Sequence, residues 1–174
     1  MIKRFIFVLL LSFSFIALPA SANTTINAGT TIKTRMAEPI DSRVRKVGYK
    51  FKMTIDSTIE KEGKILIKSG SNAQAMITHI QKSSRTVEVP EIIITLTKVT
   101  IGNRQRDVNS FQVAGKGENN KRKEVGEIDE NEHLVINQQG EKITASIPVI
   151  TKGYNLILTQ GTVVYFILKE PITL

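Results

Sequence analysis

The side chains that could do chemistry in this sequence are few and lie far apart. Its 174 residues include two histidines, His79 and His133, and no cysteine. Without cysteine, the sequence offers no thiol nucleophile, no Cys-ligated metal site and no disulfide. A serine or threonine nucleophile needs a base, usually a histidine, within hydrogen-bond reach. His79 lies inside the strand-like run Ile77–Ile80, the setting of an ordinary strand residue, so we predict no catalytic residue.

Two short patterns resemble ligand sites without meeting the requirements of those sites. The acidic run Asp129–Glu132, followed by His133, offers oxygen ligands for a hard cation. It lacks the EF-hand register and the glycine of that loop, and we interpret it as a solvated acidic loop. Gly115-Lys116-Gly117 lacks the Gly-Lys-Ser/Thr ending of a phosphate-binding loop. The sequence therefore predicts no metal and no cofactor, and we expect a protein that is not an enzyme. A secreted hydrolase with a cleft that sequence does not reveal is the alternative.

Positive charge gathers in one part of the sequence. The chain carries 24 Lys and Arg against 16 Asp and Glu, a formal charge of +8. Two strand-like runs, Thr30–Met36 and Tyr49–Ile55, each place cations on one parity, and the connection between them holds three more. If the two strands pair, the following residues form one basic face: Lys33, Arg35, Arg43, Arg45, Lys46, Lys50 and Lys52.

Such a basic face favours an anionic partner, because like charges held together repel one another until an anion neutralises them. The candidates are lipid or polysaccharide head groups and an acidic protein. Nucleic-acid readers usually add exposed aromatic side chains for stacking, and Tyr49 is the only one here, so we expect no nucleic-acid partner. The alternative is a solvated face that only keeps the protein in solution.

The elements that must position these side chains are β-strands. Apolar and polar residues alternate with period two in short runs that Gly, Asn, Ser and Lys clusters separate. No stretch shows an apolar stripe of helical period. We expect one all-β domain, a mostly antiparallel barrel or sandwich over residues 23–174. Its predicted strands are 32–36, 51–55, 63–67, 73–80, 91–101, 143–150 and 163–168.

Two segments interrupt this regular pattern. Within residues 91–101 the apolar parity changes, since Ile94 and Leu96 give way to Val99. One strand cannot present both sets to one face without a slip, so we predict a bulge or a bend near Thr97-Lys98. Residues 102–132 are polar, Gly-dotted and highly charged, and we predict a mobile loop there.

The first 22 residues read as a secretory signal peptide. A basic start is followed by the apolar run Phe5–Leu18 and by Ala20-Ser21-Ala22, the small-residue pattern of a cleavage site. A membrane span needs about 20 apolar residues, more than this run provides. We expect cleavage after Ala22 and a mature chain, without an integral membrane span, in the periplasm or outside the cell.

An internal repeat frames the mature chain. Residues 29–42 and 161–174 match at five of 14 positions, including Gly-Thr at the start and Glu-Pro-Ile near the end. The first copy has one polar, basic parity. The second copy replaces those cations with Tyr165 and Ile167 and is apolar on both faces. A strand of this kind is central or is covered by a partner. We therefore expect the two copies to lie close together, with Tyr165 and Ile167 at an interface.

The turns of the repeat resemble those of the TrbI-like β-barrel domain of type IV secretion and conjugation machines, and those of small secreted bacterial proteins with the same pattern. Asn27, Lys68 and Thr159 replace the prolines that are usual in that family. The resemblance implies a β-barrel and an assembly of envelope proteins. The membrane helix, Pro-rich spacer and apolar insertion of the family's full subunits have no counterpart here. The matching residues are Ala28-Gly29-Thr30, Ile40-Asp41-Ser42, Lys46-Val47-Gly48, Gly63, Ile67, Gly70-Ser71, Gly161-Thr162 and Glu170-Pro171-Ile172.

These observations together predict a non-catalytic secreted envelope protein. We expect it to bind another envelope protein as part of a periplasmic or outer-membrane assembly, such as a type IV secretion or conjugation system. The alternative function is a free-standing periplasmic or surface binder of an anionic polymer or lipid.

Overall fold

The fold is all-β and antiparallel, as the sequence predicts. A computed structural model describes residues 24–84, 89–117, 134–136, 142–144, 147, 149–152 and 155–174. Among these residues there is no helix, and hence none that could cross a membrane. The strands are β1 Thr25–Ile26, β2 Thr31–Met36, β3 Ile40–Asp41, β4 Lys50–Ile55, β5 Ile59–Lys61, β6 Lys64–Ile67, β7 Asn72–Gln81, β8 Glu91–Ile101, β9 Arg104–Asp107, β10 Val113–Lys116, β11 Leu134–Ile136, β12 Lys142–Thr144, β13 Ile150–Lys152, β14 Asn155–Leu158, β15 Val163–Ile167 and β16 Ile172–Thr173.

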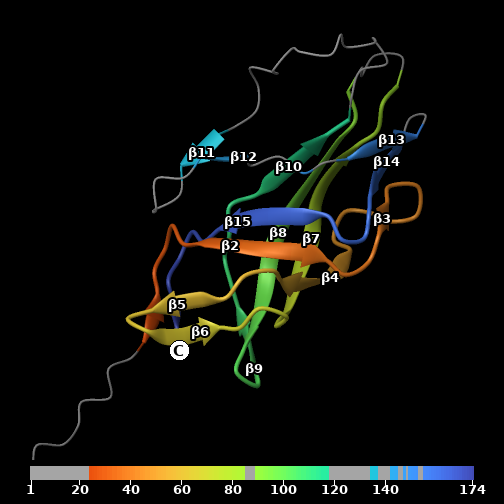
Figure 1. Ribbon diagram of the computed structural model, residues 1–174. Helices are drawn as coiled ribbons and strands as arrows, with labels where there is room; N and C mark the ends of the chain where they lie inside the picture. Colours follow the sequence, from red (N-terminus) through yellow and green to blue (C-terminus); the bar gives the residue numbers. More distant parts are fainter. Residues whose placement is uncertain are drawn as a thin grey trace, which may run out of the picture.

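One strongly curled sheet forms the body of the protein (Figure 1). Its strand order is β10-β8-β7-β4-β2-β15, and β9 pairs with the other end of β8. The segment just before β10 also bonds to the end of β15: Ser110 bridges Leu168, and the Phe111 N–H donates to the Ile167 carbonyl at 2.8 Å. The two edges of the sheet therefore meet at this point, which makes the sheet a partly closed barrel. Short sheets β1-β16, β13-β14-β3, β5-β6 and β11-β12 add to it.

The inner face of the sheet carries the hydrophobic core. Alternate residues of β2, β4, β7, β8 and β15 point inward, as the period-two pattern predicts, and Phe51 and Phe166 are the largest fully buried side chains among the described residues. Burying such a side chain contributes about 1.5–3 kcal/mol. The core residues of the central strands are Ile32, Met36, Phe51, Met53, Ile55, Ala73, Ala75, Ile77, Ile92, Ile94, Leu96, Val99, Val164 and Phe166.

The predicted bulge in β8 is confirmed. Gln74 of β7 pairs with Lys98 and its neighbour Ala75 pairs with Leu96, so Thr97 has no opposite residue. Leu96 and Val99 are both buried although their parity differs, because the extra residue shifts the strand by one position. The Thr97 hydroxyl donates to the Gln74 carbonyl at 3.0 Å, so the bulge has its own hydrogen bond.

The two copies of the internal repeat lie side by side, as predicted (Figure 1). β2 of the first copy pairs antiparallel with β15 of the second, and the equivalent residues Lys33 and Tyr165 are register partners. A local two-fold axis therefore passes between them. The copies also exchange their outer strands, because Ile26 pairs with Ile172 and its equivalent Leu158 pairs with Ile40.

The turn at the start of each copy attaches to the strand end of the other copy. The Gly29 N–H donates to the Leu168 carbonyl at 2.8 Å, and the equivalent Gly161 N–H donates to the Met36 carbonyl at 2.9 Å. Both glycines have positive φ, 81° and 85°, which L side chains adopt at a cost. The repeated Gly-Thr thus forms turns that lock the two copies together.

The prediction of a loop over residues 102–132 is wrong for the part that the structure describes. Arg104–Asp107 and Val113–Lys116 are the strands β9 and β10, both paired with β8, and residues 118–132 lie outside the described residues. The glycines that suggested a loop are instead required by close packing. A Cβ on Gly115 would lie 2.6 Å from Val149 Cγ1, and one on Gly117 would lie 2.6 Å from Thr151 Oγ1.

Two further predictions concern residues 143–150 and residues 1–22. The expected strand 143–150 is not continuous, because β12 ends at Thr144 and β13 begins at Ile150. The signal peptide, residues 1–22, lies outside the described residues and stays a prediction.

Candidate functional site

Lys33 and Arg35, on the outer face of β2, share one carboxylate. Asp56 follows β4 and receives Lys33 Nζ at 2.9 Å and Arg35 Nε at 2.8 Å. The hydrogen bonds from Arg35 and then Lys33 hold the pKa of Asp56 below its ordinary value. Arg35 Nη1 also donates to the Gly161 carbonyl at 2.9 Å. These two cations therefore join β2, β4 and the second repeat, and Asp56 offsets one of their two positive charges.

Arg43 and Arg45 also have partners within the domain. The Arg43 guanidinium bonds to both carboxylate oxygens of Asp41, and the Arg43 backbone N–H donates to Asp41 Oδ1 at 2.8 Å. Arg45 lies over the ring of Tyr49, 4.1 Å from the centroid. The Tyr49 hydroxyl donates to Glu38 Oε2 at 3.4 Å. These contacts order the connection between β3 and β4.

The other three predicted cations, Lys46, Lys50 and Lys52, are exposed. Within the described part of the chain, none of them forms an ion pair. Two carboxylates lie near this group: Glu38 accepts the Lys52 backbone N–H at 2.9 Å, and Asp107 interacts with Lys50. The pKa of Asp107 is lowered chiefly by Lys98, which bonds to it at 2.7 Å, and to a smaller degree by Lys50.

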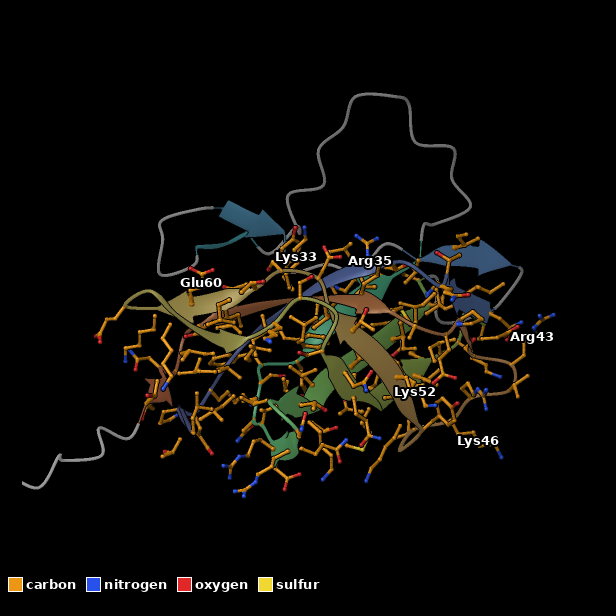
Figure 2. All side chains as sticks on the ribbon, turned by 60° about the horizontal axis from the view of Figure 1, so that its bottom comes forward. Lys33, Arg35, Arg43, Lys46, Lys52 and Glu60 are labelled. Atoms are coloured by element: carbon orange, nitrogen blue, oxygen red, sulfur yellow. The ribbon has the colours of Figure 1, made fainter. Side chains whose placement is uncertain are left out.

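The seven cations do not form one compact cluster. Figure 2 shows Lys33 and Arg35 together, Arg43 and Lys46 near the right-hand end of the view, and Lys52 between the two groups. The register explains the spread: β2 and β4 pair only through Thr34–Met36, so Lys50 and Lys52 extend past the end of β2. The outer face predicted from parity is therefore divided into two ends. Lys33 and Arg35 form the paired end with Asp56, and Lys46, Lys50 and Lys52 form the unpaired end, which has no ion pair among the described residues.

Residues 42–48, here called the basic turn, hold the most exposed apolar side chains of the unpaired end. Val44 is 69% exposed and Val47 is 59% exposed. The Val44 N–H donates to the Asp41 carbonyl, and the Tyr49 N–H donates to the Lys46 carbonyl, both at 3.1 Å. Gly48 has a φ of 87°, so residues 46–49 form a tight turn with Val47 at its corner.

Sequence reasoning missed these two valines as candidate site residues. The signal was present in Arg43-Val44-Arg45-Lys46-Val47, where apolar residues stand between cations with no strand-length alternation. In such a short connection, only the fold shows whether the valines turn inward or outward.

The predicted interface residues Tyr165 and Ile167 are half-buried on the outer face of β15. Lys33 Nζ lies 6.0 Å from the Tyr165 ring centroid, so this side chain is partly covered by its own register partner. β15 is the last strand of the curled sheet, and only the end of β15 meets the segment before β10. The apolar outer face of the second repeat is thus less open than the basic turn.

The other candidate groups do not come together. His79 is exposed on β7, and Lys116 of β10 faces Glu91 at 3.9 Å as part of an ordinary strand pair. Across the described ranges, no three His, Asp or Glu residues are close enough to hold a metal ion. The run Asp129–Glu132 and His133 lie outside these ranges.

Comparisons with known proteins return nothing for this chain: no family model, no curated protein and no solved structure matches it.

Proposed function

We propose that this protein is a non-catalytic, secreted component of a bacterial cell envelope that binds an anionic envelope partner through the basic turn and the lysines beside it. One observation carries the proposal. Four of the seven predicted cations are held by Asp56, Asp41 or Tyr49, whereas Lys46, Lys50 and Lys52 are exposed without ion-pair partners in the described structure. The basic turn adds Val44 and Val47 to the same end.

The basic turn is already ordered in the folded protein, and this supports a binding role. Its backbone is fixed by hydrogen bonds to Asp41 and Lys46, and Arg45 is stacked on Tyr49. A surface that is already ordered loses less conformational entropy when a partner binds. Exposed cations on an ordered turn are therefore better placed to bind than cations on a flexible tail.

The place of the protein in the cell is part of the same proposal. The signal-peptide pattern of residues 1–22 supports export to the periplasm or the cell surface. The resemblance to the TrbI-like barrel domain supports membership of a type IV secretion or conjugation assembly. In that setting, the half-buried apolar face of β15, with Tyr165 and Ile167, is the surface for a protein neighbour. The second candidate function is a free-standing binder of an anionic polymer or lipid, which the exposed lysines favour on their own.

Capture from envelope extract tests the proposal. Tagged mature protein is incubated with the extract at low and at high salt, and bound material is identified by mass spectrometry. The test variant is Lys46→Gln with Lys52→Gln, and the control variant is Lys68→Gln with Lys82→Gln, which removes two exposed lysines elsewhere.

We expect specific capture by the wild type and by the control, and reduced capture by the test variant. Salt should weaken the contribution of the lysines, because screening shortens charge interactions to about 8–10 Å near physiological ionic strength. Protein partners that survive high salt would identify an assembly, whereas lipid or polysaccharide released by salt would favour the free-standing binder. Equal capture by the two variants would contradict a role for this end.

A further inference from the structure

We infer that the anionic partner of the basic turn is the head-group surface of a lipid bilayer, with Val44 and Val47 entering the interface and the lysines contacting lipid phosphates. The inference rests on the proposed function, since it names the partner of the same surface. Three features of the molecule support it: the ordered backbone of the basic turn, the exposed valines on it and the lysines beside them.

The basic turn projects its apolar side chains outward at two consecutive turns of the chain. Val44 follows the turn that Asp41 holds, and Val47 occupies the corner of the tight turn closed by the Tyr49 N–H. Both are more than half exposed. Exposed apolar side chains at the tip of an ordered turn cost solvation free energy that contact with the acyl boundary would recover.

The cations lie beside these valines in the chain. Lys46 lies between Val44 and Val47 in the chain, and Lys50 and Lys52 follow on the outer face of β4. Two carboxylates lie nearby: Glu38 accepts the Lys52 backbone N–H at 2.9 Å, and Asp107 is bonded to Lys98. Neither carboxylate forms an ion pair with the ammonium groups of Lys46, Lys50 or Lys52, and an anionic lipid surface attracts cations that lie within a Debye length.

This chemistry fits a bilayer better than a protein or a soluble polyanion. Protein interfaces usually bury more than about 1,000 Å² and centre on aromatic or arginine anchors. Here the exposed apolar side chains are two valines, the aromatic residue Tyr49 is covered by Arg45, and Arg43 is bonded to Asp41. A soluble polyanion would use the lysines but would gain nothing from Val44 and Val47. A bilayer surface is anionic outside and apolar beneath, so it uses both groups.

Vesicle sedimentation tests the inference with the full mature protein. The probes are vesicles of equal parts phosphatidylglycerol and phosphatidylethanolamine, vesicles of pure phosphatidylcholine, and soluble polyphosphate. The variants are Val44→Ser with Val47→Ser, the lysine variant Lys46→Gln, and the matched control Ile65→Ser. Ile65 is 50% exposed on β6, so its replacement removes an exposed apolar side chain away from the basic turn.

We expect the wild type to bind the anionic vesicles and not the phosphatidylcholine vesicles. The double valine variant should bind about tenfold more weakly, and Lys46→Gln about fivefold more weakly. Ile65→Ser should bind like the wild type, and circular dichroism should show all variants to be folded. Polyphosphate binding should respond to the lysine change and not to the valine changes.

Two results would overturn the inference. If the wild type does not bind anionic vesicles, or if the double valine variant binds them as well as the wild type does, the bilayer is not the partner. Binding to polyphosphate or to a captured protein that depends on Lys46 would then leave the proposed function standing, while the inference about lipid fails. Loss of every interaction that depends on the lysines would reject both.

Discussion

Gly115 of β10 gives a direct test of how the domain is packed. A Cβ added there would lie 2.6 Å from Val149 Cγ1 and 3.1 Å from the Ile147 carbonyl oxygen. Carbon atoms in contact prefer a separation of about 3.5–4.0 Å, so the chain around Val149 would have to move by about 1 Å. Overpacking of this kind costs about 1–3 kcal/mol, and we expect Gly115→Ala to lower the free energy of unfolding by that amount.

A double-mutant cycle with Val149 separates this contact from a general effect of alanine in the strand. Val149→Ala removes the clashing methyl group and, because Val149 is half-buried, should cost about 1 kcal/mol by itself. The double variant should be more stable than the sum of the single effects by about 1 kcal/mol or more. The rescue should be incomplete, because the Ile147 carbonyl oxygen remains close.

Urea unfolding followed by circular dichroism measures these differences as shifts of the midpoint at constant slope. Two outcomes would refute the reasoning. Gly115→Ala could be as stable as the wild type, or the two changes could be additive. Either result would mean that β10 does not pack directly against Ile147 and Val149.

Three further predictions test other parts of the structure. The pKa of Asp56 is held below its ordinary 3.8, so the ionised carboxylate stabilises the fold above that pH, and this stabilisation is lost as the pH falls through the folded pKa. Asp56→Asn should therefore have a lower thermal midpoint than the wild type at neutral pH. The difference between the two midpoints should vanish in acid. Thr31→Val should raise the free energy of unfolding by about 1 kcal/mol, because the buried Thr31 hydroxyl has no hydrogen-bond partner among the described residues. Thr34→Val should instead lower the free energy of unfolding, because the Thr34 hydroxyl donates a hydrogen bond to the Val164 carbonyl at 2.9 Å. Replacing Tyr165 and Ile167 with serine should abolish capture of the protein neighbour while the monomer stays folded, and wild-type capture by that variant would remove β15 from the interface.

Local patterns predicted the strands well where one face is buried and the other is not. Residues 91–101 form β8 with the predicted bulge, because the change of parity between Leu96 and Val99 can be satisfied only by an extra residue. The repeat predicted that its two copies lie together, and they do. In both cases the information is contained in neighbouring residues or in similar segments.

The segments that sequence reasoning misread depend on distant contacts. β10 looks like a loop because Gly115 and Gly117 have low strand propensity, yet Ile147, Val149 and Thr151 lie too close for any side chain there. β9 consists only of polar residues, and it is a strand because β10 pairs only with residues 91–94, which leaves that edge of β8 open at residues 98–101. Propensity was overruled by packing in the first case and by pairing in the second.

The sequence by itself determined the all-β class, the alternation of core and surface, and the presence of a basic stretch. These follow from period two, from the repeated Gly-Thr turns and from the count of charges, which need no knowledge of the fold. Only the tertiary structure decided which cations are available. Asp56 is far from Lys33 and Arg35 in the sequence but opposite them across β2 and β4, and it forms an ion pair with each of them. Ion pairing and exposure depend on which chain segments meet in space, and for this reason the unpaired lysines and the exposed valines of the basic turn became visible only in the folded chain.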